Sequence, residues 1–219
     1  MGKILVKLKE DLVKTLGDNL TCLIHTGSRV RGEATEKSDY DVFLVVKTID
    51  SSVIERMRRV FSDYPDFSAY FVSKQEFKTL PRAQLLQLQY SEKLHGEIKY
   101  KSPTKKEVRD YISLMRRDCL DRVRHYLVIP HQQERLVRIA HFTLKQACLY
   151  LSYEMFLETS RLPKTRKETI TYFEERKSQE LGIRLVRIQD NWNLHEEDVA
   201  RNPESYLFLL EEFFRESLP

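Results

Sequence analysis

The chain has 219 residues and a mass of 26.1 kDa, a length that suits one large domain or two domains of about 100 residues each. Hydrophobic residues make up 41% and charged residues 32%, with only 6 Gly and 7 Pro, which excludes disordered and fibrous proteins. No apolar run approaches the roughly 20 residues of a membrane span, and the N-terminus interleaves charges where a signal peptide is apolar. We therefore expect a globular protein with no membrane partner, and the cytoplasm as its default location.

The net charge of +4 is too small to indicate a nucleic-acid-binding protein, because 37 Lys and Arg are nearly balanced by 33 Asp and Glu. The charges are unevenly distributed: residues 104–145 hold ten Lys or Arg against five Asp or Glu, whereas residues 192–219 hold two against seven. The favoured interpretation is oppositely charged helices that face each other or solvent, and the alternative is an RNA-binding or RNA-cleaving surface over residues 104–145.

The first hundred residues have the pattern of an α/β unit. Apolar side chains at helical spacing predict helices over residues 3–16, from a cap at Ser51 or Ser52 to about Phe61, and after Pro81. Runs rich in β-branched and aromatic residues predict strands at 20–27, 39–47 and 67–72, and an edge strand at 95–100. The polar, glycine-punctuated segment between the first two strands is expected to be a functional loop or a short helical turn.

A Ser-Pro turn and several charges at 101–106 mark a change of pattern, and no convincing strand follows. Four long segments with helical periodicity come next, at 107–127, 134–158, 165–178 and 203–216. The second segment is apolar on most faces and is expected to be the central helix of a bundle. The predicted fold class is α+β, with an α/β domain carrying a small mixed sheet at 1–103 and an all-α bundle at 104–219.

The segment from Gly27 to Asp41 carries the strongest chemical signal. Asp39 and Asp41 lie two positions apart on a predicted strand, so their side chains project to the same face. Two like charges on one face indicate a divalent cation, since Mg²⁺ is held by one or two carboxylates together with waters and substrate phosphates. Gly27 and Gly32 let backbone approach an anion, and Ser28 with the local amides can bind phosphate oxygens. Each piece alone also fits a solvated strand end or a turn, but their order and spacing favour a phosphate and metal site.

The run GSRVRGEATEKSDYDVFLVV, residues 27–46, resembles the signature of the DNA polymerase β-like nucleotidyltransferase superfamily, in particular its minimal nucleotidyltransferase branch. The resemblance implies transfer of a nucleoside monophosphate from a nucleoside triphosphate, with ATP favoured, to a hydroxyl acceptor while pyrophosphate leaves. It implies Mg²⁺, with Mn²⁺ as a substitute, on Asp39 and Asp41. Contacts to the nucleotide are implied for Gly27, Ser28, Arg31 and Ser38.

The family usually has a third carboxylate on a later strand, which helps to bind the catalytic metal and activates the acceptor hydroxyl. The hydrophobic pattern of residues 67–72 puts Ser68 at that position. Asp66 is two residues earlier on the same nominal face and replaces the missing acid if the register shifts or the strand bulges, so it joins Asp39 and Asp41 as a candidate catalytic residue. Asp66 also fits a loop, and Glu76 is a more distant candidate. Without a third acid, the alternative is a catalytically weak nucleotide-binding module of regulatory or antitoxin-like kind.

The helical half is similar in size and pattern to the helical partners of such enzymes, namely HEPN-type bundles and the C-terminal bundles of aminoglycoside nucleotidyltransferases. This similarity implies a protein acceptor such as a HEPN-type toxin, or a small hydroxylated acceptor, and it favours a homodimer through the helical half. Arg135 and His141 have about the spacing of the arginine and histidine that act on RNA in HEPN ribonucleases. Because they lie in a strongly apolar helix, His141 is interpreted as a partly buried histidine rather than as part of such a site. The tyrosines of this half are interpreted as core side chains with hydroxyls at the rim rather than as a base-stacking platform; they are Tyr150, Tyr153, Tyr172 and Tyr206.

Overall fold

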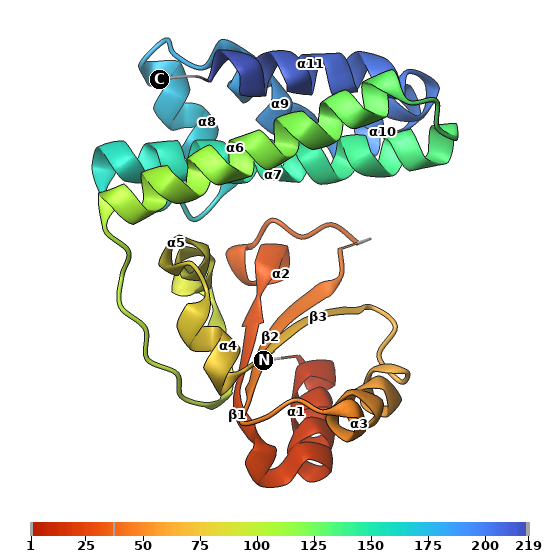
Figure 1. The fold of residues 1–219 in the computed structure, drawn as a ribbon, viewed down its shortest axis with the longest axis vertical. Helices are drawn as coiled ribbons and strands as arrows, with labels where there is room; N and C mark the ends of the chain where they lie inside the picture. The colour runs from red at the N-terminus through yellow and green to blue at the C-terminus, as the bar shows by residue number, and fades with distance from the viewer. Residues whose placement is uncertain (1, 37, 218–219) are drawn as a thin grey trace. The chain divides into compact units, whose positions relative to one another are not determined.

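The computed structural model describes residues 2–36 and 38–217. Contacts divide the chain into two compact units, Met1–Pro103 and Thr104–Pro219. The first unit contains a small mixed sheet with helices and the second is helical (Figure 1), so the α+β fold class is confirmed. That residues 1–103 and 104–219 are two domains stays a prediction. Within the described ranges, no helix combines the length and the apolar character that crossing a bilayer requires.

The sheet has four strands in the order β3-β2-β1-β4. Strand β1 pairs antiparallel with both β2 and β4, whereas β2 and β3 are parallel. The bounds are Leu20–Thr26 for β1, Tyr40–Val46 for β2, Phe67–Ser73 for β3 and Glu92–Gly96 for β4. The first three match the predicted strands. The edge strand predicted at 95–100 is wrong by about three residues, because Leu94 supplies the buried side chain and Gly96, at φ +62°, ends the strand.

Helices cover both faces of this sheet. The α-helices of the first unit are α1 (Lys3–Leu16), α2 (Gly27–Arg31), α3 (Ser51–Phe61), α4 (Lys74–Thr79) and α5 (Arg82–Leu85), and the 3₁₀ turns are η1 (Gly17–Asn19) and η2 (Leu86–Tyr90). The predicted cap of α3 is wrong, because Asp50 accepts the hydrogen bond from the Val53 amide at 2.8 Å. The helix predicted after Pro81 is α5, which begins at Arg82 and continues into η2. Helix α4 before it was not predicted, and it begins at Lys74 because Ser73 and Glu76 form a capping box.

The two faces of the sheet bury different sets of side chains. One face packs Leu23, Val42 and Leu44 against the buried leucines of α1 and the apolar face of α3. The other face packs Phe43 and Val45 with side chains of α4 and α5. Because side chains alternate along a strand, Asp41 belongs to the same face as Phe43 and Val45.

The helical unit is built around one helix. Helix α7 (Gln133–Thr159) packs against all five of the other helices described in this unit, which confirms its predicted central place. The others are α6 (Lys105–Val128), α8 (Arg166–Glu175), α9 (Glu180–Asp190), α10 (Trp192–Arg201) and α11 (Pro203–Glu216). Helices α9 and α10 were not predicted. Basic α6 packs against acidic α11, and Arg124 forms an ion pair with Glu211 at 2.7 Å, as the interpretation of facing charged helices expects.

Candidate functional site

The ends of three neighbouring strands bring the signature residues together. In the register of the sheet, Thr26 of β1 is the partner of Asp41, and Asp41 is the partner of Ser68 on β3. Helix α2 begins directly after β1, at Gly27, and contacts both β1 and β2. The glycine-serine turn and the aspartate pair are therefore neighbours at one end of the central strands, although eleven to fourteen residues of sequence separate them.

Asp41 lies directly against Gly27. A Cβ built on Gly27 would be 1.9 Å from Asp41 Oδ2, and the φ angle of this glycine is +81°. A side chain at position 27 would thus occupy the space of the carboxylate and would also strain the backbone. The Asp41 carboxylate therefore lies directly beside the Gly27–Ser28 turn, which places a predicted metal ligand next to a predicted phosphate-binding turn.

Asp39 is solvent-exposed and comes just before β2. The backbone around it is held by Arg29 of α2, whose Nε donates to the carbonyl oxygens of Ser38 at 3.1 Å and Asp39 at 3.2 Å. The guanidinium of Arg29 also lies 4.0 Å above the ring of Tyr40. Sequence reasoning missed Arg29, because the family motif drew attention to Arg31 and nothing in the pattern distinguishes two arginines on one short helix.

The predicted nucleotide-binding residues have different environments. Ser28 is partly exposed on α2, and its carbonyl oxygen accepts a hydrogen bond from the Glu33 amide at 2.9 Å. The Ser38 hydroxyl accepts from the Thr35 amide at 2.9 Å and so closes a turn of the loop. Arg31 pairs with Glu33 at 3.0 Å. The structure thus brings Ser28 beside Gly27, whereas it engages Ser38 and Arg31 in contacts that organise the loop.

The third carboxylate is the point where the chain departs from the motif. Ser68, and not an acid, is the strand partner of Asp41. Asp66 lies in the turn before β3, with an exposed side chain and a carbonyl oxygen that accepts the Tyr40 amide at 2.8 Å. Glu76 caps α4 through the Ser73 amide at 2.7 Å, and this bond lowers the pKa of its carboxyl group. Glu76 is therefore engaged in helix capping, and Asp66 lies in the turn that leads into β3, beside the start of β2.

A buried histidine lies on the strand that leads into the site. His25 on β1 is 5% exposed, and Nδ1 lies 3.5 Å from Glu92 of β4. Burial lowers the pKa of His25, and the neighbouring Glu92 opposes that shift. The sequence contains no signal for His25, since a single histidine in an apolar strand belongs to no motif.

The alternative sites of the helical unit are structural. The ring of His141 stacks on Trp192 with 3.9 Å between centroids, and burial lowers the pKa of His141 to about 4. Arg135 instead donates to the Tyr126 hydroxyl at 3.1 Å, so the two residues with HEPN spacing have separate partners.

The four tyrosines of the helical unit are buried, and three of their hydroxyls form hydrogen bonds: Tyr150 with Ser217, Tyr172 with Glu158 and Tyr206 with Asp198. Their interpretation as core side chains is confirmed.

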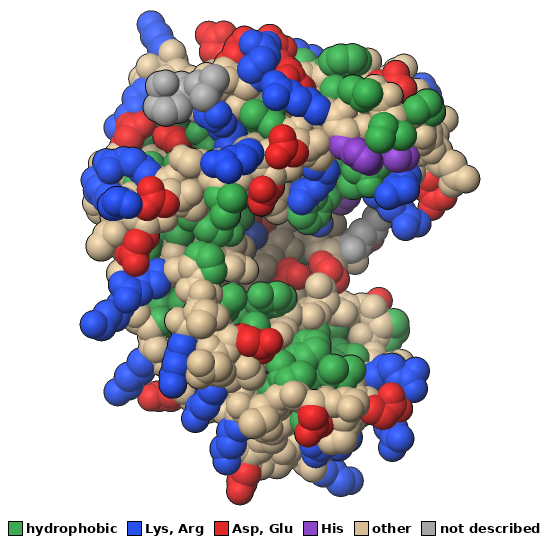
Figure 2. All heavy atoms as spheres, in the orientation of Figure 1, with side chains coloured by type: hydrophobic (Ala, Val, Ile, Leu, Met, Phe, Trp, Pro, Cys, Tyr) green, Lys and Arg blue, Asp and Glu red, His purple; other side chains and the backbone are tan. Residues whose placement is uncertain are grey.

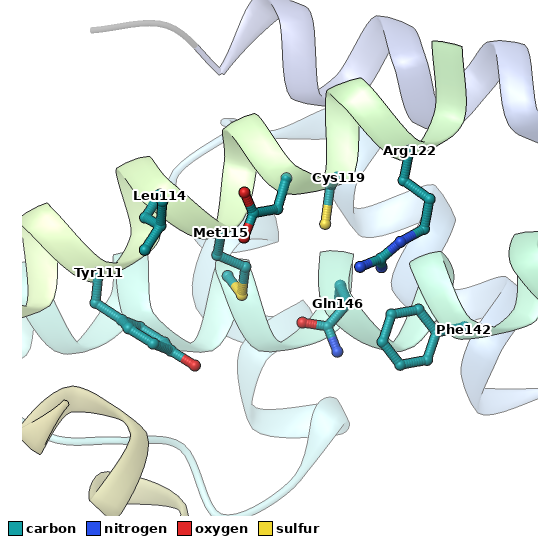
Figure 3. A pocket seen from close by; sticks show the side chains of 8 residues that line it. Tyr111, Leu114, Met115, Cys119, Arg122, Phe142 and Gln146 are labelled. Atoms are coloured by element: carbon teal, nitrogen blue, oxygen red, sulfur yellow. The ribbon is translucent and has the colours of Figure 1, made fainter. Parts of the chain in front are cut away.

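The helical unit also has a shallow pocket of about 140 Å³ between α6 and α7 (Figure 3). Arg122 lies 4.6 Å from the ring of Phe142 at one end of it. The remaining lining residues are Tyr111, Leu114, Met115, Asp118, Cys119 and Gln146. None of the sequence-predicted site residues lines this pocket.

Basic side chains form no continuous stripe on the face that Figure 2 shows. Lys and Arg are spread over both units and alternate with acidic side chains. Many of them belong to ion pairs along one helix, such as Lys106 with Asp110 and Arg138 with Glu134. This arrangement is typical of solvated helices rather than of a nucleic-acid interface.

The donor set at the strand ends fits a magnesium ion. Asp41 faces the Gly27 turn, Asp39 is exposed two residues earlier, and carboxylate oxygens are the ligands that Mg²⁺ prefers. Across residues 2–36 and 38–217, no three His, Cys, Asp or Glu side chains gather as a ready metal centre. Two carboxylates with substrate phosphates and waters complete an octahedral shell, so a phosphate-bearing ligand and the ion are expected to bind together.

Comparison with known proteins agrees with this geometry. The family model described as a nucleotidyltransferase domain matches residues 5–114. A search of curated proteins found no match. Among solved structures, the spectinomycin adenyltransferase AAD(9) from Enterococcus faecialis, solved with ATP and spectinomycin, has a TM-score of 0.63 and 14% sequence identity. The alignment covers 98% of this chain and 100% of that one, so the two share a fold over both units. With half of its residues matched by the family model, the chain belongs to the nucleotidyltransferase domain family.

Proposed function

We propose that this nucleotidyltransferase moves AMP from ATP to a hydroxyl group of its acceptor, with Mg²⁺ bound at Asp39 and Asp41 and pyrophosphate as the leaving group. The observation that carries the proposal is the Asp41 carboxylate against Gly27, because it joins a metal ligand to a phosphate-binding turn. Family membership supports nucleotide transfer in general. The adenyltransferase of the same fold was solved with ATP, which supports ATP as the donor.

The residues at the strand ends divide the work of the reaction. Gly27 and Ser28 bind oxygens of the triphosphate through backbone amides and the serine hydroxyl, and no Cβ obstructs them. Asp39 and Asp41 would hold the ion. When bound, the ion would neutralise charge that develops on the transferred phosphate and the leaving group. Arg31 and Ser38 shape the loop around the triphosphate through Glu33 and Thr35.

Asp66 is proposed as the third acid, which accepts the proton of the attacking hydroxyl. Its backbone is hydrogen-bonded to Tyr40, between the two metal ligands, and its carboxylate is exposed. The acceptor proposed is a small hydroxylated molecule such as an aminoglycoside, since the neighbour of the same fold was solved with spectinomycin. A protein hydroxyl, as on a HEPN-type toxin, is the other acceptor class that the sequence indicates.

The test is pyrophosphate release from ATP with Mg²⁺ and a panel of hydroxylated acceptors, spectinomycin included. Wild type is expected to release pyrophosphate only with an acceptor. Asp66→Asn is expected to lower turnover by about a hundredfold or more, the contribution of a general base, while Mg-dependent ATP binding stays within about twofold. Unchanged turnover of Asp66→Asn would remove Asp66 from the mechanism.

A second candidate function is a binding module that holds Mg-ATP without transfer, and the pairing of Ser68 with Asp41 favours it. This function predicts saturable Mg-ATP binding by wild type and no pyrophosphate with any acceptor. Ser68→Asp would then restore measurable turnover by placing an acid opposite Asp41. If wild type releases pyrophosphate in an acceptor-dependent way, the binding module is excluded.

A homodimer through the helical unit stays a prediction. Val128 (79% exposed), Leu194 (74%) and Phe208 (61%) are large apolar side chains that such a contact could cover. Light scattering at micromolar concentration gives the mass directly. A mass near 26.1 kDa would contradict the dimer.

A further inference from the structure

We propose that Arg29 is a positioning residue, which fixes the backbone of Ser38 and Asp39 so that the Asp39 carboxylate is held ready for the metal. This inference rests on the proposed function, because it assigns a support to one of the two proposed metal ligands. It is drawn from the hydrogen bonds that one guanidinium group makes to backbone carbonyls and from the aromatic rings beneath it.

The hydrogen bonds of Arg29 converge on the chain just before β2. Its Nε donates to the carbonyl oxygens of Ser38 at 3.1 Å and Asp39 at 3.2 Å, and its Nη2 donates to Ser38 as well. Two successive carbonyls are thus bound by one planar group with fixed donor directions. This contact fixes the peptide that precedes Asp39 and leaves the Asp39 side chain exposed.

Aromatic stacking fixes the guanidinium in turn. Arg29 lies 4.0 Å above the Tyr40 ring, and Tyr40 stacks on Phe67 with 4.8 Å between centroids. Phe67 meets Tyr64 edge-on at 5.5 Å, and Tyr64 is only 4% exposed. The stack therefore runs from the loop into the core between the sheet and α1 and α3. A guanidinium held between such a stack and two carbonyls has little freedom left.

Arg29 and Arg31 consequently have different tasks although both belong to α2. Arg31 forms an ion pair with Glu33, a bond within the loop. Arg29 instead connects α2 to the start of β2, across ten residues of sequence. Outer partners of metal ligands commonly contribute a factor of about 10 to 100 in metal affinity, and Arg29 is in the position to do so for Asp39.

The test compares Arg29→Lys and Arg29→Met with wild type by calorimetric titration of a non-hydrolysable ATP analogue, once with Mg²⁺ and once in EDTA. Lysine retains the charge but loses the planar donors and most of the stacking. Both variants are expected to weaken binding about tenfold or more with Mg²⁺ and less than twofold in EDTA. Both are also expected to increase amide hydrogen exchange of residues 38–41 in the protein without ligand.

The matched control is Arg56→Lys, because Arg56 also donates to a backbone carbonyl of the same unit, that of Thr15 at 3.0 Å. It is expected to leave binding unchanged under both conditions. The inference would be overturned if Arg29→Lys bound the ATP analogue with Mg²⁺ as tightly as wild type does, because the charge alone would then account for the role of Arg29. It would also be overturned if affinity fell equally with and without Mg²⁺, because a direct phosphate contact would then account for that role. With either result the proposed function is still supported if Asp41→Asn abolishes the Mg-dependent part of nucleotide binding. Absence of Mg-dependent binding in wild type would overturn both.

Discussion

Polar side chains are arranged differently in the two units. In the helical unit several buried ones have internal partners: Tyr172 donates to Glu158 at 2.5 Å, Tyr206 to Asp198, and His141 stacks on Trp192. In the first unit, side chains at the strand ends are exposed although their backbones are tightly held, as Asp39 and Asp66 illustrate. Rigid backbone with exposed carboxylates is the arrangement of a binding site, whereas internally satisfied polar groups stabilise a fold.

The largest effect on the site of the first unit is expected from a substitution at Gly27. Gly27→Ala puts a methyl group within 1.9 Å of Asp41 Oδ2 and adds the strain of φ +81°. We expect Mg-dependent ATP binding to fall about a thousandfold or more, since a metal contribution of several kcal/mol is lost. Stability is expected to fall by about 1–3 kcal/mol. Calorimetric titration and denaturant unfolding measure the two effects.

Gly17→Ala is the matched control for that variant. Gly17 has φ +52° and no atom lies within 4 Å of a Cβ built on it, so alanine adds the same kind of strain far from Asp41, at the other end of β1. A stability loss of about 1 kcal/mol with binding unchanged within about twofold is expected. If both variants bound Mg-ATP equally, the contact between Gly27 and Asp41 would have no role in the site.

The buried His141 makes the stability of the helical unit depend on pH. Its pKa in the folded protein is lowered to about 4, first by burial and then by Lys145, against an ordinary value of 6.5. The unfolded chain therefore binds the proton more readily, and stability is lost as pH falls from about 6.5 toward 4. The loss from this group is about 2–3 kcal/mol. His141→Phe retains a ring against Trp192 and should lose that much less stability over the same pH range.

The measurement is denaturant unfolding at pH 7.5 and pH 4.5, monitored by fluorescence. Trp192 is the single tryptophan of the chain, so the signal reports the helical unit. Equal losses in wild type and His141→Phe would contradict a neutral, buried His141. A change of nucleotide affinity in this variant would contradict the assignment of His141 to structure.

The smallest expected effect is at the ion pair between α6 and α11. Arg124 is half exposed, so the pair with Glu211 is screened by water and salt. A double-mutant cycle of Arg124→Ala and Glu211→Ala is expected to give a coupling below about 1 kcal/mol, and less in 1 M salt. A coupling several times larger would mean that charge, and not the apolar surface of α7, organises the bundle.

Sequence predicted the elements whose own residues decide their structure. The leucines of α1, the apolar runs of β1 to β3 and the length of α7 are strong local signals. Helices α9 and α10 were missed because Gly182 interrupts the pattern of α9 and because only Asn191 separates the two helices. The edge strand was misplaced because one buried side chain, Leu94, decides its position, and burial depends on the rest of the fold.

In the candidate site, too, features decided by a local motif were predicted and features that depend on the rest of the fold were not. The motif predicted that Gly27 and Asp41 act together, and the strand register brings them into contact. Arg29 could not be predicted, since its role depends on where Tyr40 and the carbonyl of Ser38 lie in space. The hydrophobic pattern of residues 67–72 put Ser68 at the position of the third carboxylate of the family, and the structure adds that Ser68 is the strand partner of Asp41.

The most direct test of the central claim is the titration of wild type and Asp41→Asn with ATP analogue in the presence and absence of Mg²⁺. Asp50→Asn is the matched control, because Asp50 caps α3 in the same unit and asparagine also caps helices well. We predict that Asp41→Asn removes the Mg-dependent part of binding, while Asp50→Asn retains it and both variants stay folded. Wild-type Mg-dependent binding by Asp41→Asn would contradict the account, because the carboxylate against Gly27 would then not hold the metal.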